Sequence, residues 1–370
     1  MAKQRILSTE QNYLELEQYL DEKQAKVVLL VCDGSFGFLK VGSFLEDIEK
    51  RKQIRFVKFS DFTPNPLYES VVKGVQALKE ENCDLILAVG GGSAMDVAKC
   101  IKLYSNMNPE QCYLEQEIVP NSLPLAAVPT TAGTGSEATR YAVIYYNGEK
   151  QSVTHESCIP GAVLLDESAL ETLPEYQKKS TMLDAFCHAV ESFWSVNSTE
   201  ESREYSETAI KLILENKEAY LTNTRAGNKN MLLAANIAGK AINITQTTAG
   251  HAMCYKLTSL YGIAHGHAAA LCVSVLWPYM LKHKEDCIDP RGQVHLTSIF
   301  EALAETMGVD CPKCAVRKYK EILQELNLTV PQMAEQDYKV LKTSVNPVRL
   351  KNNPVKLTEE VIEQLYREIK

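Results

Sequence analysis

The chain has 370 residues, of which 45% are hydrophobic and 23% charged, and its formal net charge is −8. This is the composition of a globular protein with room for two domains, not of a disordered or fibrous one. The acidic balance argues against a nucleic-acid partner, because nucleic-acid-binding proteins usually carry a basic excess on one face. No apolar run approaches the roughly eighteen residues of a membrane span, so no membrane partner is expected.

The amino-terminal stretch lacks the apolar core of a signal peptide, and its pattern is typical of a folded domain. The eleven cysteines are an odd number, scattered without a framework and in several cases inside apolar runs. Reduced, buried thiols explain that pattern better than disulfides do. Both observations predict a cytoplasmic protein.

The first part of the chain alternates between apolar runs and helical patterns. Buried strands are predicted at 26–32, 54–59, 84–90 and 123–128, with intervening helices that end near residues 50 and 81. Continuous apolar runs are typical of strands buried on both faces. Their alternation with helices predicts an α/β domain with a parallel sheet that is covered by helices on both sides.

The second part of the chain is helical, with almost no alternating or β-branched runs. Charge-rich stretches at 200–207 and 335–337 are interpreted as solvated faces. The boundary between the two parts lies between Asp166 and Pro174, which predicts domains at 1–170 and 171–370. Helical periodicity predicts helices at 176–196, 201–217, 228–246, 249–257, 266–283, 293–306, 313–326 and 358–369.

Three of the seven histidines fall within residues 250–267, and a further one lies four residues after an aspartate. On a helix, positions i and i+4 share one face, so Asp184 and His188 can face a common ion. A single histidine on a helix is more often a core or surface residue. One carboxylate and three imidazoles in a histidine-poor chain instead favour a four-ligand site for a first-row divalent metal, formed by Asp184, His188, His251 and His265.

Two polar loops follow predicted strands. Gly90-Gly-Gly-Ser93 lies where a strand ends and a helix begins, and glycine together with free helix N–H groups suits a pyrophosphate. This turn is neither a GxGxxG nor a Walker loop, and alone it could be merely a tight turn. The hydroxyl-rich loop 129–137 follows the next strand, at the edge where α/β sheets bind ligands. Asp33, after the first strand, can accept from ribose hydroxyls and repel a 2′-phosphate, although it is also an ordinary turn residue.

Four motifs together resemble the iron-dependent, group III alcohol dehydrogenase family: GGGSAMDVAK at 90–99, PTTAGTGSE at 129–137, the Asp184/His188 pair, and His251 with His265 fourteen residues later. They occur in the family's order and spacing over nearly the whole chain. The resemblance implies a Rossmann-like dinucleotide-binding domain, an all-α carboxy-terminal domain and a cleft between them, which is a dehydroquinate synthase-like architecture.

The resemblance also implies bound ligands and an assembly. The four predicted ligands would hold Fe²⁺, or in some members Zn²⁺, and the cofactor would be NAD(H), with NADP(H) as the alternative. A homodimer is expected because the family commonly forms one. The implied cofactor contacts are Asp33, Gly90, Gly91, Gly92, Ser93, Asp96, Thr130, Thr131, Thr134 and Lys150.

One position departs from the family pattern. Many members carry a second histidine four residues after the third ligand, where this chain has Tyr255 followed by Lys256. The surrounding run resembles the branch that contains phosphonoacetaldehyde reductases, which form 2-hydroxyethylphosphonate. A phosphonate carries about two negative charges, so Lys256, Arg140 and His267 are candidate charge-assisted donors. Lys256 is equally interpretable as a solvated helix residue. His267 and Tyr255 are candidate proton relays.

These observations predict a metal-dependent oxidoreductase that reduces a small aldehyde to a primary alcohol with NAD(P)H. Within the same family, a short-chain alcohol or diol dehydrogenase is the main alternative. A dehydroquinate-synthase-like lyase shares the architecture, but the intact 129–137 loop and the Asp184/His188 pair favour the dehydrogenase. A non-catalytic nucleotide-binding protein would need no metal ligands.

Overall fold

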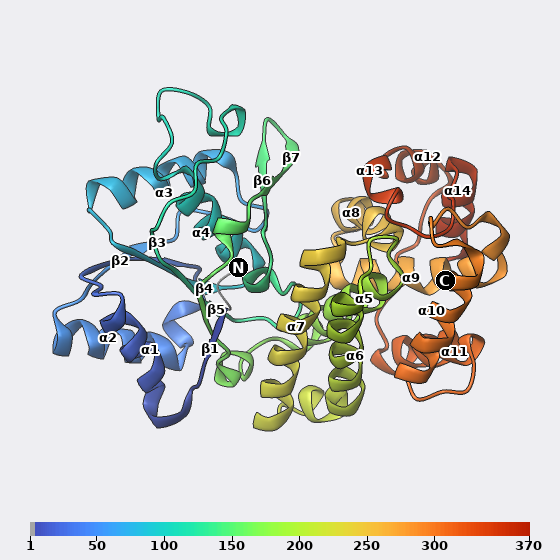
Figure 1. Ribbon diagram of the computed structural model, residues 1–370, viewed down its shortest axis with the longest axis horizontal. Helices are drawn as coiled ribbons and strands as arrows, with labels where there is room; N and C mark the ends of the chain where they lie inside the picture. Colours follow the sequence, from blue (N-terminus) through green and yellow to red (C-terminus); the bar gives the residue numbers. More distant parts are fainter. Residues whose placement is uncertain (1–3) are drawn as a thin grey trace. The chain divides into compact units, whose positions relative to one another are not determined.

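The computed structural model describes residues 4–370, so the first three residues of the amino-terminal stretch lie outside it. The chain divides into two compact units, each described by itself (Figure 1). The amino-terminal unit comprises the chain up to residue 131 and residues 135–173, and the carboxy-terminal unit comprises residues 132–134 and 174–370.

The amino-terminal unit is built on a six-stranded sheet whose strands all pair in parallel. The predicted α/β fold with a parallel sheet is therefore confirmed. Two three-residue strands on one side of the sheet were not predicted, because three residues are too few to show a hydrophobic period. In spatial order the strands are β1 (Arg5–Leu7), β8 (Ala162–Leu164), β5 (Leu125–Pro129), β4 (Leu85–Gly90), β2 (Val27–Cys32) and β3 (Arg55–Phe59).

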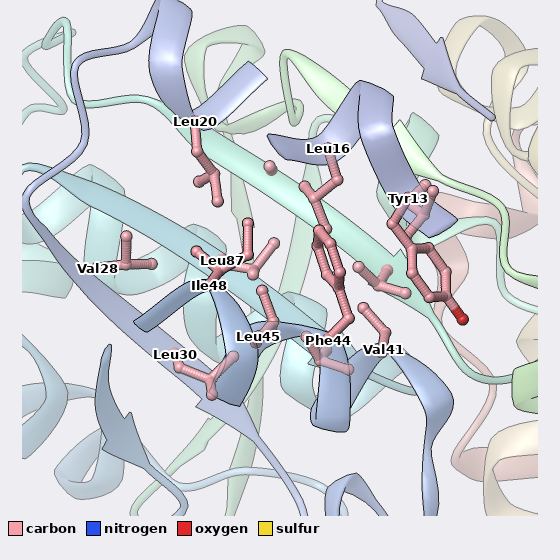
Figure 2. Packing of buried hydrophobic residues seen from close by; sticks show 14 of the residues in the cluster. Tyr13, Leu16, Leu20, Val28, Leu30, Val41, Phe44, Leu45, Ile48 and Leu87 are labelled. Carbon is pink, nitrogen blue, oxygen red and sulfur yellow. The ribbon is translucent and has the colours of Figure 1, made fainter. Parts of the chain in front are cut away.

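Helices cover both faces of this sheet (Figure 1). On one face lie α1 (Glu10–Glu22) and α2 (Lys40–Lys52), and on the other α3 (Tyr68–Glu80) and α4 (Gly92–Tyr104). Alternate strand residues point to opposite faces, and both faces are covered, which is why the central strands β2, β4 and β5 are apolar throughout. Burying one such leucine contributes about 1.5–3 kcal/mol. Figure 2 shows the face under α1 and α2, where the core includes Leu16, Leu20, Phe44, Leu45, Ile48, Val28, Leu30 and Leu87.

An antiparallel hairpin inside the amino-terminal unit was missed by the sequence analysis. Its strands are β6 (Tyr141–Tyr146) and β7 (Glu149–Thr154). Tyr146 pairs with Glu149 next to the turn, and Tyr141 pairs with Thr154 at the far end. The two linking residues, Asn147 and Gly148, have φ of 51° and 77°. An Asn-Gly pair with both φ positive is the preferred two-residue hairpin turn, so the signal was present in the sequence.

The carboxy-terminal unit is helical, as predicted. No helix within residues 4–370 is both long enough and apolar enough to cross a membrane. Two short helices, α12 (Glu335–Thr343) and α13 (Pro347–Leu350), were not predicted, because their sequences are polar and the second contains only one turn. The others are α5 (Glu175–Trp194), α6 (Glu200–Leu221), α7 (Arg225–Thr245), α8 (Ala249–Tyr261), α9 (His265–Lys282), α10 (Gly292–Thr306), α11 (Pro312–Leu326) and α14 (Glu359–Glu368).

Candidate metal centre and cofactor loops

In the carboxy-terminal unit, α5 supplies two residues, Asp184 and His188, to a cluster of polar side chains. This helix begins after Pro174, and no glycine or proline interrupts it. Asp184 and His188 lie four positions apart on it and therefore share a face. Both are buried, at 3% and 6% exposure. Nε2 of His188 lies 3.9 Å from Oδ1 of Asp184.

The second half of the cluster comes from the α8–α9 turn. His251 is the third residue of α8 and His265 is the first residue of α9. The helices are separated by Gly262, whose φ of 66° ends α8 in the left-handed conformation that favours glycine. Nε2 of His251 and Nε2 of His265 lie 3.4 and 4.0 Å from Oδ1 of Asp184. The turn thus brings residues from three helices around one carboxylate oxygen.

The donor set fits a tetrahedral divalent metal. Ligand atoms in such a site lie about 3.4 Å apart, given bonds of about 2.1 Å. The potential ligand atoms of Asp184, His188 and His251 all lie within 4.8 Å of one another. Nδ1 of His188 is buried without a hydrogen-bond partner in the described chain. Three imidazoles and one carboxylate suit Fe²⁺ and Zn²⁺ alike.

The cluster is buried on one side and open on the other. The side chains of Asp184 and His251 are 4% and 1% exposed, whereas that of His265 is 36% exposed. His265 packs against Cys254, with Sγ 3.5 Å from Nδ1, and stacks on Tyr255, with ring centres 5.3 Å apart. The side occupied by His265 is therefore where a small molecule can reach the cluster.

Burial and mutual charge set the protonation of the cluster. Burial lowers the pKa of His188 to about 4, which leaves the imidazole neutral and able to bind metal. Burial alone would raise the pKa of Asp184, but the surrounding histidines, His188 foremost, leave that pKa below its usual value. Burial would lower the pKa of His251, yet Glu191 and Asp184 raise it to about 9. In the metal-free protein, His251 is therefore expected to be protonated at neutral pH, with its Nε2 facing the carboxylate of Asp184.

Glu191 is a buried residue in contact with the cluster that the sequence analysis missed. Its Oε2 accepts a hydrogen bond from Nδ1 of His251, and the side chain is fully buried. Its Oε1 accepts from the hydroxyl of Thr248 at 2.5 Å and from the backbone N–H groups of Thr248 and His251 at 3.1 and 3.3 Å. Its spacing could have indicated this contact, because Glu191 follows Asp184 by seven residues, nearly two helical turns, and so lies on the same face of α5. It holds the first turn of α8 and orients the ring of His251.

Gly266 lets α9 approach α5. A Cβ at this position would lie 2.0 Å from the backbone oxygen of Ser180 and 2.6 Å from Cβ of Asp184. No residue larger than glycine fits such a contact without a shift of the backbone. Gly266 therefore determines how close its neighbour His265 comes to Asp184.

The other predicted residues of this unit lie around the cluster in different ways. Tyr255 follows His251 by four positions on α8 and shares its face, as its stacking on His265 shows. Lys256 is half-buried one position further on, about 100° around the helix. His267 is 2% exposed, and its Nδ1 lies 3.2 Å from the hydroxyl of Tyr176, while its Nε2 has no partner within residues 4–370. Burial lowers the pKa of His267.

In the amino-terminal unit, the predicted phosphate turn lies at the carboxyl end of β4. Gly91 precedes the first turn of α4, where the helix N–H groups are free for an anion. A Cβ at Gly90 would lie 2.6 Å from Cβ of Ala94 and 3.2 Å from Oδ2 of Asp33. The other carboxylate oxygen of Asp33 accepts from the N–H and hydroxyl of Ser35, at 2.8 and 2.6 Å. Asp33 and the glycine turn are thus neighbours, with one carboxylate oxygen directed to the turn.

The hydroxyl-rich loop begins beside this turn. The N–H of Thr130 donates to the carbonyl of Gly90 at 3.0 Å. The side chain of Thr131 lies 3.6 Å from where a Cβ on Gly91 would be. Thr134 belongs to the short segment that groups with the carboxy-terminal unit. Gly92 and Ser93 are the first two residues of α4.

A buried lysine organises the remainder of this loop and was also missed. Nζ of Lys99, which is fully buried, donates to the hydroxyls of Ser136 and Thr139 at 3.0 and 3.2 Å and to the carbonyl of Tyr141 at 2.8 Å. The Ser136 hydroxyl donates in turn to Asp96 at 3.0 Å. Burial raises the pKa of Asp96 to about 6, against the lowering effect of Lys99.

Lys150 and Arg140 lie on or beside the hairpin. Lys150, on β7, is close enough to Asp96 to lower its pKa. Nη1 of Arg140 pairs with Glu156 at 2.9 Å, and its guanidinium carbon lies 5.5 Å from the ring centre of Tyr141. The roles assigned to these two residues stay predictions.

Comparison with known proteins agrees with this geometry. The family described as iron-containing alcohol dehydrogenase matches residues 3–167, and the carboxy-terminal family of Fe-containing alcohol dehydrogenases matches residues 178–370. A phosphonoacetaldehyde reductase from Streptomyces viridochromogenes is 30% identical over 317 residues, which cover 81% of this chain and 80% of that protein.

Solved structures share the fold along the whole chain. The iron-containing alcohol dehydrogenase from Thermococcus thioreducens has a TM-score of 0.89 at 21% identity, covering 100% of this chain and 98% of that one. Sulfoacetaldehyde reductase from Bifidobacterium kashiwanohense, solved in complex with NAD⁺, has a TM-score of 0.87 at 23% identity, covering 100% and 97%. At these identities the two structures are evidence of a common fold.

Proposed function

Because the chain belongs to the iron-containing alcohol dehydrogenase family, we propose that it reduces phosphonoacetaldehyde to 2-hydroxyethylphosphonate with NADH. The observation that carries the proposal is the arrangement of three imidazoles around Oδ1 of Asp184, open only beside His265. The proposed ligands are Asp184, His188, His251 and His265, holding Fe²⁺ or Zn²⁺. Such a metal would supply a Lewis acid for the aldehyde oxygen.

The chain's own residues prepare this site. Glu191 holds the Nδ1–H of His251 and so leaves Nε2 as the nitrogen that faces Asp184. The lowered pKa of His188 keeps that ring neutral at physiological pH. Burial on the α5 side excludes water from the carboxylate, which strengthens electrostatic stabilisation of a developing alkoxide.

The reaction needs one hydride and one proton. The nicotinamide supplies the hydride to the aldehyde carbon, and NADH becomes NAD⁺. The alkoxide oxygen must then receive a proton, for which Tyr255 and His267 are the proposed relays. Burial raises the pKa of Tyr255, so its phenol keeps its proton at neutral pH and acts as a donor.

NADH is proposed over NADPH because of Asp33. Its carboxylate oxygen directed to the Gly90 turn can accept from ribose hydroxyls and would repel a 2′-phosphate. The NAD⁺ complex of the sulfoacetaldehyde reductase supports the same choice. Asp33, the 90–93 turn, Asp96, Thr130, Thr131, Thr134 and Lys150 are the proposed cofactor contacts.

The phosphonate assignment rests on the relative from Streptomyces viridochromogenes and on the residue pattern around Tyr255. The test is NADH oxidation, followed by absorbance, with metal-reconstituted protein and either phosphonoacetaldehyde or butanal. We expect a preference of about 10²-fold or more in kcat/KM for the phosphonate, which is about 2.7 kcal/mol of transition-state discrimination.

Other outcomes would point elsewhere. Equal turnover of the two aldehydes would overturn the phosphonate assignment and leave a short-chain alcohol or diol dehydrogenase. Turnover of neither aldehyde with iron or zinc would favour a lyase, which recycles its NAD and releases no oxidised cofactor. For the relays, His267→Ala and Tyr255→Phe are expected to lower kcat at neutral pH, and unchanged kcat would remove the residue concerned.

A further inference from the structure

Arg349 lies one aromatic ring away from the cluster. Its Nη1 donates to the hydroxyl of Thr247 at 2.6 Å, and its guanidinium carbon lies 5.5 Å from the ring centre of Tyr255. The ring of Tyr255 in turn stacks on His265, with centres 5.3 Å apart. The ring of Tyr255 therefore lies next to both the guanidinium of Arg349 and the half-buried His265.

The charge of Arg349 is not neutralised by the protein. Within residues 4–370, no carboxylate lies at ion-pairing distance from its guanidinium, whereas Arg291 pairs with Asp289 and Arg367 with Glu335. A guanidinium carries five N–H donors in a planar fork that matches carboxylate, phosphonate or sulfonate oxygens. The hydroxyl of Thr247 uses one donor, so most of the fork remains available for an oxyanion.

Hydrogen bonds of two asparagines flank Arg349 in the chain. Nδ2 of Asn352, a residue 8% exposed, donates to Gln246 Oε1 at 3.1 Å and to the carbonyl of Thr247 at 3.2 Å. At the other end of the segment, Asn346 caps α13 by accepting from the N–H of Val348 at 2.8 Å. The bonds of Asn352, two residues after α13, fasten this segment to the link between α7 and α8. The guanidinium is therefore positioned relative to α8, the helix that carries His251.

Lys256 is less suited than Arg349 to bind an oxyanion beside the cluster. It lies five positions after His251, about 140° around α8, so the two side chains do not share a face. Tyr255, at four positions, does share it, and the guanidinium of Arg349 lies at that ring. The guanidinium of Arg349, on α13, therefore lies at a ring on the His251 face of α8.

We propose that Arg349 is the receptor for the anionic group of the substrate, and this inference rests on the proposed function. The substrate class is a two-carbon aldehyde with a terminal phosphonate or sulfonate. Such a molecule spans about 4–5 Å from its aldehyde oxygen to its terminal oxygens. In the proposed complex the aldehyde oxygen lies at the cluster, and the oxygens of the anionic group accept from the guanidinium of Arg349.

The test compares Arg349→Met and Arg349→Lys with wild type on phosphonoacetaldehyde, sulfoacetaldehyde and butanal. For Arg349→Met we expect kcat/KM to fall about 10²-fold for the phosphonate and to change less than about threefold for butanal. Arg349→Lys keeps the charge and loses the fork, and should recover part of the loss, chiefly for the dianionic phosphonate. Arg317→Met, on the exposed face of α11, is the matched control and should behave as wild type. Thermal melting of each variant checks the fold.

A binding measurement separates this inference from the proposed function. Methylphosphonate should inhibit wild type in competition with the aldehyde and should inhibit Arg349→Met at least about tenfold more weakly. If wild type turns over neither anionic aldehyde, the proposed function fails. If wild type prefers the anionic aldehydes and Arg349→Met keeps that preference, the function stands and the inference is overturned. A loss of preference in Lys256→Met with none in Arg349→Met would also overturn it, as would an equal loss on butanal.

Discussion

Glu191 and His251 form a fully buried pair in which the carboxylate accepts the Nδ1–H of the imidazole. Nε2 of the same ring lies 3.4 Å from Oδ1 of Asp184. Because a neutral imidazole has one protonated nitrogen, the bond to Glu191 decides which nitrogen is left for a metal. The pair thus connects a helix-capping contact at the start of α8 to the chemistry of the site.

Glu191→Gln should weaken metal binding about 10–100-fold, because the amide is a poorer acceptor for the Nδ1–H of His251. The measurement is competition for Zn²⁺ with a chromophoric chelator. Glu175→Gln, at an exposed position of the same helix, is the control and should bind as wild type does. Wild-type affinity in Glu191→Gln would show that the carboxylate only caps α8.

Metal binding should be pH-dependent through His251. Its pKa of about 9 means that metal-free protein carries this proton at neutral pH, and the metal must displace it. Affinity should therefore rise about tenfold for each pH unit between roughly pH 6 and 9, as expected when one proton is released on binding. Isothermal titration in buffers of different ionisation enthalpy counts the protons. In Glu191→Gln the release at pH 8 should decrease, because Glu191 is the main cause of the raised pKa; an unchanged count would contradict this.

Gly266→Ala should disrupt the cluster. The added methyl group would lie 2.0 Å from the backbone oxygen of Ser180, so α9 must move away from α5. We expect a loss of about 3 kcal/mol or more in urea unfolding, since overpacking against backbone cannot relax through a rotamer change. Metal content after reconstitution should fall as well. Gly37→Ala, where nothing lies within 4 Å, is the control and should change stability by less than about 0.5 kcal/mol.

Lys99→Met should destabilise the amino-terminal unit, because it removes a buried cation and the three hydrogen bonds that its Nζ donates. A cost of about 3–5 kcal/mol is expected for such a change. The pKa of Asp96 is raised to about 6 in the folded protein. Ionisation of this carboxyl group therefore lowers the free energy of unfolding as the pH rises through that value. Since Lys99 offsets that charge, the loss caused by Lys99→Met should be larger at pH 8 than at pH 5. Urea unfolding at both pH values tests this, and equal losses would show that Asp96 is not coupled to Lys99.

Asp33→Ser should shift the cofactor preference. Removing the carboxylate next to the Gly90 turn removes the repulsion of a 2′-phosphate, so the ratio of kcat/KM for NADPH to that for NADH should rise about tenfold or more. Asp61→Ser, at an exposed ion pair with Lys73, is the control. A ratio that stays constant would mean that Asp33 does not contact the ribose.

Local pattern was sufficient for much of the molecule. The apolar runs at β2, β4 and β5 predicted buried parallel strands, since a strand covered on both faces needs no polar side chains. The i, i+4 spacing of Asp184 and His188 predicted a common helical face, because helix geometry alone determines it. The Asn147-Gly148 turn is a local signal of the same kind, because an Asn-Gly pair with two positive φ angles is the preferred two-residue hairpin turn.

Other relationships exist only after the chain has folded. No spacing links Arg349 to Tyr255, or Lys99 to Thr139, because those pairs form when separate elements pack against each other. Gly266 shows the same limit: its sequence context marks a helix start, and only the contact with Ser180 explains why a glycine is required. Local periodicity and residue type were enough to predict the long helices, the central strands and the chemical types of the proposed ligands. Packing between remote segments determines that Arg349 has no carboxylate at ion-pairing distance within residues 4–370 and that Nε2 of His251 faces Asp184, because burial and distance control both.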